Sequence, residues 1–492
     1  MRKNLTTLST AFLLLYFAEI GFAGLAVRPA SLRAAGRPRW VPNEIVVKFK
    51  EGLPENRIDR INQRHGTSVL YTSPFAGFKR IKLPAGRTAR QAVELYNREP
   101  DVEYAELNYY AYALFEPDDP YYYLQWHLYE TYAGINIEPA WDITTGDPNV
   151  IIAVVDTGVA YENFRSYQQA PDLANTRFVP GYNFIRNNAH ANDDDGHGTH
   201  ITGTIAQSTN NGLDVAGIAF NCSIMPVKVL NKRGEAPYTT VADGVYFAAD
   251  NGADVINLSL SGPADATTLR DAIAYAYNQG VTIVCAAGND GPGGPAAYPA
   301  AYDAYCIAVG ATRYDQAITY YSTTGSYLDV AAPGGQIYIE GTTQILDQNG
   351  DGYGDGVLQQ TFGSSPRDWD YLWFYEGTSM AAPHVTGIAA LLISTGVTGL
   401  DAVREALQNT ARDLGPDGWD EEYGWGLVDA YAALNYYHIP GDFDRDGSVD
   451  LDDLKTLATH WLGDEPLVDI APPERDGIIN FLDFAIFAEN WN

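Results

Sequence analysis

The 492-residue chain is 46% hydrophobic, enough for a folded core, and carries a formal net charge of −31 at neutral pH. Its length allows two to four domains, and the acidity is concentrated after residue 107, where 52 Asp and Glu accompany 14 Lys and Arg. This large negative charge argues against nucleic acid or an anionic membrane as a partner. It fits a secreted, calcium-binding protein, and a surface adapted to salt is a second interpretation.

The chain begins with a segment typical of export. Residues 1–23 have the basic start of a signal peptide, an apolar core over 11–18, and small residues before a cleavage position after Ala23. No later apolar run reaches the ~18 residues of a membrane span. We therefore expect a secreted or cell-surface-associated protein without a membrane span, in which residues 24–40 form a linker.

Residues 41–115 form a separate small unit. Its strand-like and helical segments follow the order β-α-β-β-α-β, which is typical of a ferredoxin-like α+β module. An unrelated small α/β domain is the alternative. The aromatic and proline-bearing stretch 108–120 at its end predicts an extended connection to the next domain.

Residues 121–438 alternate apolar runs with helical stretches. Such alternation predicts a parallel β-sheet with helices on both faces. Three cysteines in apolar surroundings, Cys222, Cys285 and Cys306, are expected to be buried free thiols; one disulfide with an odd thiol is the alternative. The apolar runs lie near 150–155, 224–230, 254–260, 281–287 and 305–310, and the helical stretches at 239–251 and 265–279.

Three short stretches in this domain carry residues suited to nucleophilic catalysis. Ser379 follows a glycine turn and opens a run of small apolar residues that predicts a buried helix, with Pro383 in its first turn. Asp156 ends the apolar strand at 150–155, and His197 stands in a glycine-rich loop before a second helix. A serine hydroxyl needs a base to take its proton, and the base needs an acid to orient it. Taken alone, Ser379 would be interpreted as the cap of a core helix. The acid and the histidine in the other two stretches favour the catalytic interpretation instead.

These stretches, together with the apolar strand 281–287 and Asn289 after it, closely resemble the subtilisin family of serine peptidases. The resemblance implies a subtilisin-like α/β fold in which Asp156 orients His197, His197 is the general base and acid, and Ser379 is the nucleophile. Asn289 would donate to the oxyanion. It implies a secreted endopeptidase that hydrolyses peptide bonds through an acyl-enzyme on Ser379. The alternative is a catalytically silent binding or scaffold protein attached through its C-terminal tail.

The same resemblance extends to the flanking and substrate-binding segments. Residues 41–115 are similar to an inhibitory propeptide, which implies a self-processing zymogen cut within 108–120. The stretch 257–262 is similar to the family's substrate-binding strand, and 234–238 to the strand opposite. The implied substrate-binding residues are Ser259, Leu260, Ser261, Gly234 and Tyr238.

Calcium is the cofactor that the resemblance implies. A first set of ligands matches a calcium site of the family: Gln125, Asp172, Asn211, Leu213 and Val215. A second set lies in an insertion at 336–374 and resembles the first nine positions of an EF-hand loop; a flexible acidic loop is the alternative. Its members are Asp347, Asn349, Asp351 and Asp355.

Residues 441–492 predict a small EF-hand-like α tail. Five acids fill positions of a calcium loop before a helical apolar spacing, and a weaker copy follows before Phe484, Phe487 and Trp491. The two loop–helix repeats resemble a type I dockerin, which implies a cohesin-type module as partner; a calcium-stiffened appendage without a partner is the alternative. We otherwise expect protein or peptide substrates, no nucleic acid, and a monomeric catalytic domain. The five acids are Asp442, Asp444, Asp446, Asp450 and Asp453.

Overall fold

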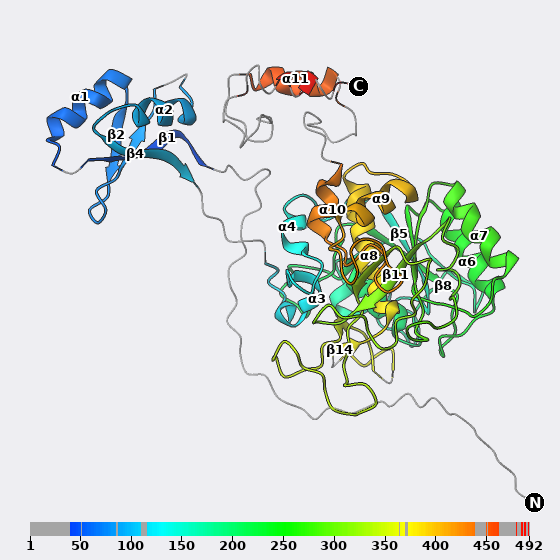
Figure 1. Cartoon of the computed structure of the whole chain (residues 1–492). Helices are drawn as coiled ribbons and strands as arrows, with labels where there is room; N and C mark the ends of the chain where they lie inside the picture. The colour runs from blue at the N-terminus through cyan, green and yellow to red at the C-terminus, as the bar shows by residue number, and fades with distance from the viewer. Residues whose placement is uncertain are drawn as a thin grey trace, which may run out of the picture.

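The computed structural model describes most of the chain from residue 40 onward (Figure 1). The predicted signal peptide, the linker up to residue 39 and most of the dockerin-like tail lie outside the described residues. The described residues are 40–50, 52–84, 87–109, 116–363, 365–369, 372–437, 449, 451–461, 479, 484–485, 487–488 and 491.

The N-terminal unit has the predicted β-α-β-β-α-β order. Its four strands form an antiparallel sheet in the order β2-β3-β1-β4. Helix α2 begins with a capping box, in which Thr88 and Gln91 satisfy each other's free backbone N–H groups. A core of its own, including Ile45, Ile81 and Tyr96, holds the unit together. The elements are β1 (Trp40–Phe49), α1 (Glu55–His65), β2 (Ser68–Thr72), β3 (Lys79–Lys82), α2 (Ala89–Asn97) and β4 (Val102–Tyr109).

The second unit is built on a parallel sheet, which confirms the predicted α/β fold. Its strand order is β12-β11-β10-β9-β5-β8-β6, with the short strand β7 paired to β8. The central strands are buried on both faces, which explains why they are continuous apolar runs. The strands are β5 (Ile151–Asp156), β6 (Arg177–Phe178), β7 (Tyr182–Asn183), β8 (Ser223–Lys228), β9 (Val255–Leu258), β10 (Thr282–Ala286), β11 (Ile307–Thr312) and β12 (Val330–Pro333).

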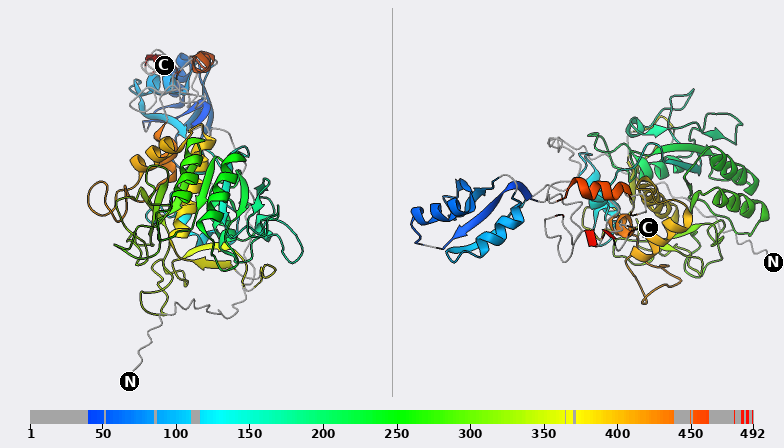
Figure 2. Two further views of the ribbon diagram at one scale, coloured as in Figure 1. Left: turned by 90° about the vertical axis from the view of Figure 1, so that its right-hand side faces the viewer. Right: turned by 90° about the horizontal axis from the view of Figure 1, so that it is seen from above.

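Helices cover both faces of this sheet (Figures 1 and 2). Helices α5 (His197–Ala206) and α8 (Thr378–Ser394) pack against each other on one face, and α6 (Tyr238–Asp250) and α7 (Thr267–Asn278) pack together on the other. The remaining helices lie around this core: η1 (Tyr122–Leu124), α3 (Trp126–Tyr129), α4 (Ile137–Trp141), η2 (Pro171–Leu173), α9 (Leu400–Thr410) and α10 (Ala430–Tyr436).

Helix α8 corrects one expectation. Pro383 is the sixth residue of the helix and lies inside it, so the prediction that it sits in the first turn is wrong. An interior proline removes a hydrogen bond to the carbonyl four residues earlier, here that of Ser379. The helix is nevertheless continuous, and the Ser379 carbonyl oxygen accepts a hydrogen bond from the hydroxyl of Ser259 at 2.8 Å.

The cysteines, the insertion at 336–374 and the helix lengths bear on further predictions. Cys222, Cys285 and Cys306 are buried and free, as expected. The insertion carries an antiparallel hairpin that the sequence did not reveal, β13 (Val357–Gln360) with β14 (Leu372–Tyr375). Within the described residues, no helix combines the length and apolar character needed to cross a bilayer.

The described part of the tail contains helix α11 (Leu451–Thr459). Leu457 in this helix shares a small buried cluster with Val449, Ile479 and Phe487. Asp453, the last acid of the first predicted calcium loop, is buried at the start of the helix. The other four acids, Asp442, Asp444, Asp446 and Asp450, lie outside the described residues.

Candidate active site

Asp156 and His197 form a bonded pair at the carboxyl end of β5. Asp156 is fully buried, and its Oδ1 lies 2.8 Å from Nδ1 of His197, the first residue of α5. Helix α5 can come this close because Gly198 has no side chain: a Cβ there would lie 2.2 Å from the carbonyl oxygen of Gly158. Since Nδ1–H donates to the carboxylate, the neutral imidazole has its lone pair on Nε2, where it can accept a proton.

Nearby carboxylates control the protonation of His197. Burial alone would lower its pKa, but the charge and hydrogen bond of Asp156, with Asp195 and Asp193 behind them, raise the pKa of His197 to about 9. Burial, reinforced by Asp193, also raises the pKa of Asp195, to about 6. The acidic loop therefore favours the imidazolium, which is the charge state formed when a base takes a proton from a nucleophile.

Asp193 fixes the start of α5. Its Oδ1 accepts from the backbone N–H of Asp195 at 3.0 Å and of Gly196 at 3.1 Å. Its Oδ2 accepts from the N–H and the hydroxyl of Thr199, at 3.0 and 2.7 Å. These bonds satisfy N–H groups at the helix N-terminus that have no partner within the helix. Asp193 thus fixes the helix start on which His197 stands.

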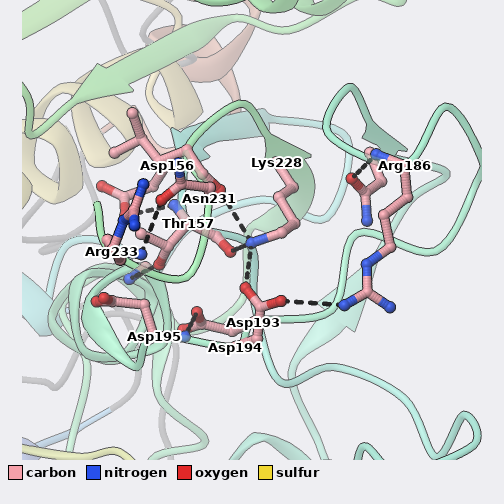
Figure 3. A network of polar contacts seen from close by, with 12 residues as sticks. Asp156, Thr157, Arg186, Asp193, Asp194, Asp195, Lys228, Asn231 and Arg233 are labelled. Atoms are coloured by element: carbon pink, nitrogen blue, oxygen red, sulfur yellow. Dashed lines mark hydrogen bonds and ion pairs between the residues drawn. The ribbon is translucent and has the colours of Figure 1, made fainter. Parts of the chain in front are cut away.

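A buried lysine joins the two segments that carry the pair (Figure 3). Lys228 lies on β8 directly opposite Asp156, and its side chain is 1% exposed. Its ammonium donates to the carbonyl oxygen of Thr157 and, at 2.7 Å, to Oδ1 of Asp194, whose other oxygen lies 3.3 Å from Arg186. One cation therefore holds both the residue after Asp156 and the loop before His197. Sequence reasoning missed Lys228, although a lysine within the apolar run 224–230 was the available signal.

Ser379 is the second residue of α8 and is half-buried. Its hydroxyl donates to the carbonyl oxygen of Ser259 at 3.2 Å. Because α5 and α8 pack together and begin at His197 and Thr378, their N-termini supply both the histidine and the serine. A helix N-terminus also favours negative charge that develops beside it.

Asn289 follows β10 and lies beside the start of α8. Its Oδ1 accepts from the backbone N–H of Thr378 at 3.0 Å and from that residue's hydroxyl at 2.9 Å. Both partners are donors, so the amide is oriented with Nδ2 facing the other way. A side-chain carbon at Gly377 would lie 3.7 Å from Asn289 Nδ2 and 3.7 Å from the nitrogen of Ser379. Two N–H donors therefore flank a space that the glycine keeps open.

The predicted substrate-binding residues fall into two segments. Strand β9 ends at Leu258, and Ser259 is buried, Leu260 half-buried and Ser261 exposed. The segment 234–238 is not a strand: Gly234 lies in a turn and Tyr238 begins α6. Pro237 before it has no N–H for a ladder and occupies the N-cap position of the helix, without a side-chain capping bond.

The first predicted calcium set is largely brought together. Asp172, fully buried, accepts from Asn211 Nδ2 at 2.8 Å and from the N–H of Val215 at 3.1 Å. Gln125 Oε1 accepts from the N–H that follows Val215, at 2.7 Å, while Leu213 is 38% exposed. Burial raises the pKa of Asp172 to about 8, despite the hydrogen bonds from Asn211 and Val215. A carboxylate in this position would be stabilised by a cation.

The second predicted set lies on one tight loop. Asp347 accepts from the backbone N–H groups of residues 350–352, and Asn349 Nδ2 donates to Asp351 at 2.9 Å. Asp355 is buried, and burial raises its pKa to about 6. Across the part of the chain that the structure describes, no three or more His, Cys, Asp or Glu side chains gather as a metal cluster.

Comparisons with known proteins agree with this geometry. The Subtilase family matches residues 147–426, and the fervidolysin N-terminal prodomain matches residues 28–108. The thermophilic serine proteinase of Bacillus sp. (strain AK1) is 34% identical over 398 residues, 81% of this chain and 88% of that protein. The halolysin-like extracellular serine protease Nep of Natrialba magadii is 35% identical over 443 residues, 86% of this chain and 72% of that protein.

Solved structures lead to the same family. Proteases from Pseudoalteromonas arctica PAMC 21717 superpose with a TM-score of 0.55 at 34% identity, over 65% of this chain and 98% of theirs. The family match contains the ends of β5 and β10 and the starts of α5 and α8. The chain therefore belongs to the subtilase family and is a subtilisin-type serine endopeptidase that carries an N-terminal prodomain.

Proposed function

We propose that Ser379 attacks the peptide carbonyl, that His197 takes and returns its proton, and that Asp156 orients the imidazole. The observation that carries the proposal is the 2.8 Å bond between His197 Nδ1 and the buried Asp156 carboxylate. That bond leaves Nε2 as the base and stabilises the imidazolium formed when the hydroxyl loses its proton. The proton then passes to the leaving amine, and water hydrolyses the acyl-enzyme by the reverse sequence.

The oxyanion of the tetrahedral intermediate would be bound between Asn289 Nδ2 and the backbone N–H of Ser379. The amide of Asn289 supports this role because its oxygen is occupied by Thr378, which leaves the nitrogen to donate. Preoriented donors of this kind stabilise the transition state without reorganising during the reaction. The positive end of α8 acts in the same direction.

A fluorophosphonate probe tests the assignment of the nucleophile. The wild-type protein should be labelled at Ser379, and Ser379→Ala should lose both the label and turnover, the latter by roughly six orders of magnitude. Ser223→Ala is a suitable control, since Ser223 lies at the opposite end of β8 from Lys228. Stoichiometric labelling of Ser379→Ala would disprove the assignment.

The peptide substrate would bind along the backbone at 259–261, across from 234–238. Tyr238 lies against the residues that follow the first segment: its hydroxyl accepts from the N–H of Ala264 at 3.3 Å and would lie 2.1 Å from a Cβ at Gly262. Profiling cleavage of a peptide library would give the side-chain preference. Cleavage patterns unchanged by Ser261→Gly and by Tyr238→Ala would argue against this placement.

We further propose that the protein is secreted as a zymogen and that the cut within 108–120 is self-cleavage. The prodomain match at 28–108 and the extracellular relative support this proposal. Purified Ser379→Ala should keep its prodomain, and sequencing the mature N-terminus of the wild-type protein should locate the cut. Complete processing of the pure variant, with no other protease present, would contradict self-cleavage.

Calcium is proposed to bind at Asp172 with Gln125, Asn211 and the backbone oxygens of residues 213 and 215. The donor set is all oxygen and contains a fully buried carboxylate, which suits this hard cation. When bound, calcium would supply charge compensation and cross-link the loops that carry these residues. The loop from Asp347 to Asp355 is a second candidate.

Calcium titration of the Ser379→Ala chain tests both sites. Chelation should lower the thermal midpoint, and a ligand concentration a hundred times the dissociation constant should restore about 2.7 kcal/mol. Asp172→Asn should remove most of that response, and Asp347→Asn should remove any second increment. An unchanged midpoint on chelation would contradict calcium binding at either place.

The tail 441–492 is proposed to be a dockerin-like calcium-binding module that takes a cohesin-type partner. The buried position of Asp453 in α11 and the packing of Phe487 with Leu457 support a loop–helix pair. Calorimetric titration of the full Ser379→Ala chain with a cohesin module, with and without calcium, is the test. Absence of calcium-dependent binding would favour an appendage without a partner.

A further inference from the structure

The carbonyl group of Ser379 lacks its ordinary helical partner. In α8 the donor to this carbonyl would be the backbone N–H at position 383, which Pro383 does not have. The oxygen instead lies 2.8 Å from Oγ of Ser259, just beyond the end of β9. Since a carbonyl can only accept, the Ser259 hydroxyl is the donor.

That hydroxyl is itself held by a bond from Asn257, which in turn is held by Thr386. Asn257 Nδ2 donates to Ser259 Oγ at 3.0 Å, and the Thr386 hydroxyl donates to Asn257 Oδ1 at 2.8 Å. Asn257, Ser259 and Thr386 are all buried, so no solvent competes for these groups. The chain of bonds leaves α8 at Thr386, crosses to β9 and returns to α8 at Ser379, past the proline.

We propose that Ser259 is a positioning residue for the nucleophile. Its hydroxyl replaces the helix hydrogen bond that Pro383 removes, and so fixes the peptide plane that follows Ser379. The direction of that plane sets the Cα–Cβ bond of Ser379 and hence the place of its Oγ. This inference rests on the proposed role of Ser379. It gives the side chain of Ser259 a task separate from the backbone at 259–261, which would bind the peptide.

The proline provides a compensating substitution. Ser259→Ala should leave the Ser379 carbonyl without a donor and lower kcat roughly ten- to a hundredfold, with little change in KM. Pro383→Ala alone should have a small effect. The double variant Ser259→Ala/Pro383→Ala should recover most of the lost kcat, because replacing the proline restores a backbone N–H that can donate to the Ser379 carbonyl. Rates of labelling by a fluorophosphonate should follow the same order.

Ser223→Ala is the matched control. Ser223 is also buried, and its hydroxyl also donates to a backbone carbonyl, that of Pro148 at 2.7 Å. It should lower stability without changing kcat. If Ser259→Ala fails to fold, Thr386→Val removes only the first donor of the chain and should lower kcat by a smaller factor.

Two results would overturn the inference. The first is a wild-type kcat in Ser259→Ala, or in Thr386→Val where Ser259→Ala does not fold. The second is a double variant whose kcat is no higher than that of Ser259→Ala. Ser379→Ala, measured in parallel, separates this failure from that of the proposed function. If Ser379→Ala is inert while the Ser259 variants behave as wild type, only the positioning role is wrong. If Ser379→Ala keeps its label, the assignment of the nucleophile is wrong.

Discussion

Three buried imidazoles beside helices α5 and α8 should each contribute a loss of stability to the second unit as pH falls. His127, His200 and His384 are fully buried. His384 Nδ1 lies 2.8 Å from the carbonyl oxygen of Met380, to which it must donate, so its Nε2 accepts from His127 Nδ1 at 2.8 Å. His200 Nε2 donates to carbonyl oxygens of the β13–β14 hairpin, both at 3.1 Å. The bonds of all three rings suit neutral imidazoles.

Burial gives this arrangement a definite pH dependence. It lowers the pKa of His200 to about 3 and of His384 to about 4, and with the neighbouring imidazoles it lowers that of His127 far below the ordinary value. In the unfolded chain histidine titrates near ~6.5. Below that pH the unfolded state therefore binds more protons, and stability present above it is lost as pH falls toward about 4. Each of the three histidines lowers the free energy of unfolding by about 1.4 kcal/mol per pH unit over this range, so together they lower it by about 4 kcal/mol per pH unit.

A difference measurement isolates one imidazole. Buried acids instead raise stability as pH falls. Burial raises the pKa of Asp329, for example, to about 7, so the folded state takes up this proton at a higher pH than the unfolded state does. His127→Gln in the Ser379→Ala background keeps a donor for His384 but cannot titrate. As pH falls from 7.5 to 5, the free energy of unfolding of the variant should rise by about 2 kcal/mol relative to that of its parent, as measured by chemical denaturation.

Above pH 7.5 the difference between the two proteins should be constant, because the His127 ring is neutral there in both the folded and the unfolded states. Equal pH dependence of variant and parent down to pH 5 would refute the reasoning. It would mean that His127 is charged in the folded state or that water reaches it.

Asn289→Ala should lower kcat by roughly 10²–10³ with KM nearly unchanged; an unaffected rate would place the oxyanion donor elsewhere. Asp195→Asn removes a negative charge that raises the pKa of His197, so the acid limb of kcat/KM should move to lower pH, by roughly one unit or less. A shift to higher pH would show that Asp195 acts otherwise. Lys228→Met should lower the free energy of unfolding by about 3–5 kcal/mol. Adding Asp194→Asn should restore part of it, because the half-buried Asp194 carboxylate, left with Arg186 alone, is then neutral. Simple addition of the two losses would contradict that pairing.

The sequence alone predicted the elements whose pattern is local. The apolar run 281–287 became β10 at 282–286, and the helical stretch 239–251 became α6 at 238–250. Continuous apolar strands and small-residue helices are recognisable because both faces of this sheet are covered. The glycine-bounded motifs around Asp156, His197 and Ser379 were also readable, since each combines a turn with a reactive side chain.

Contacts between residues that are far apart in the sequence could not be predicted. Lys228 was simply a lysine within the apolar run 224–230, and only the strand pairing shows it beside Asp156 with Asp194 as its partner. Ser259 was expected to act on substrate through its strand, yet its side chain faces Ser379. The hydrogen bond between them joins residues 120 positions apart in sequence. No periodicity in the sequence encodes such a contact.

The order of the strands explains why these distant residues meet. In the sheet, β10, β9 and β5 are adjacent and parallel, so their carboxyl ends lie side by side. Asn289, Ser259 and Asp156 come at or just after those three ends. Ligands of open α/β sheets bind at this edge. Helices α5 and α8 then need only begin at the same edge to bring His197 and Ser379 to the three strand ends. A substitution that moves one strand end should therefore disturb the whole site, whereas one at the opposite edge, such as Ser223→Ala, should change stability alone.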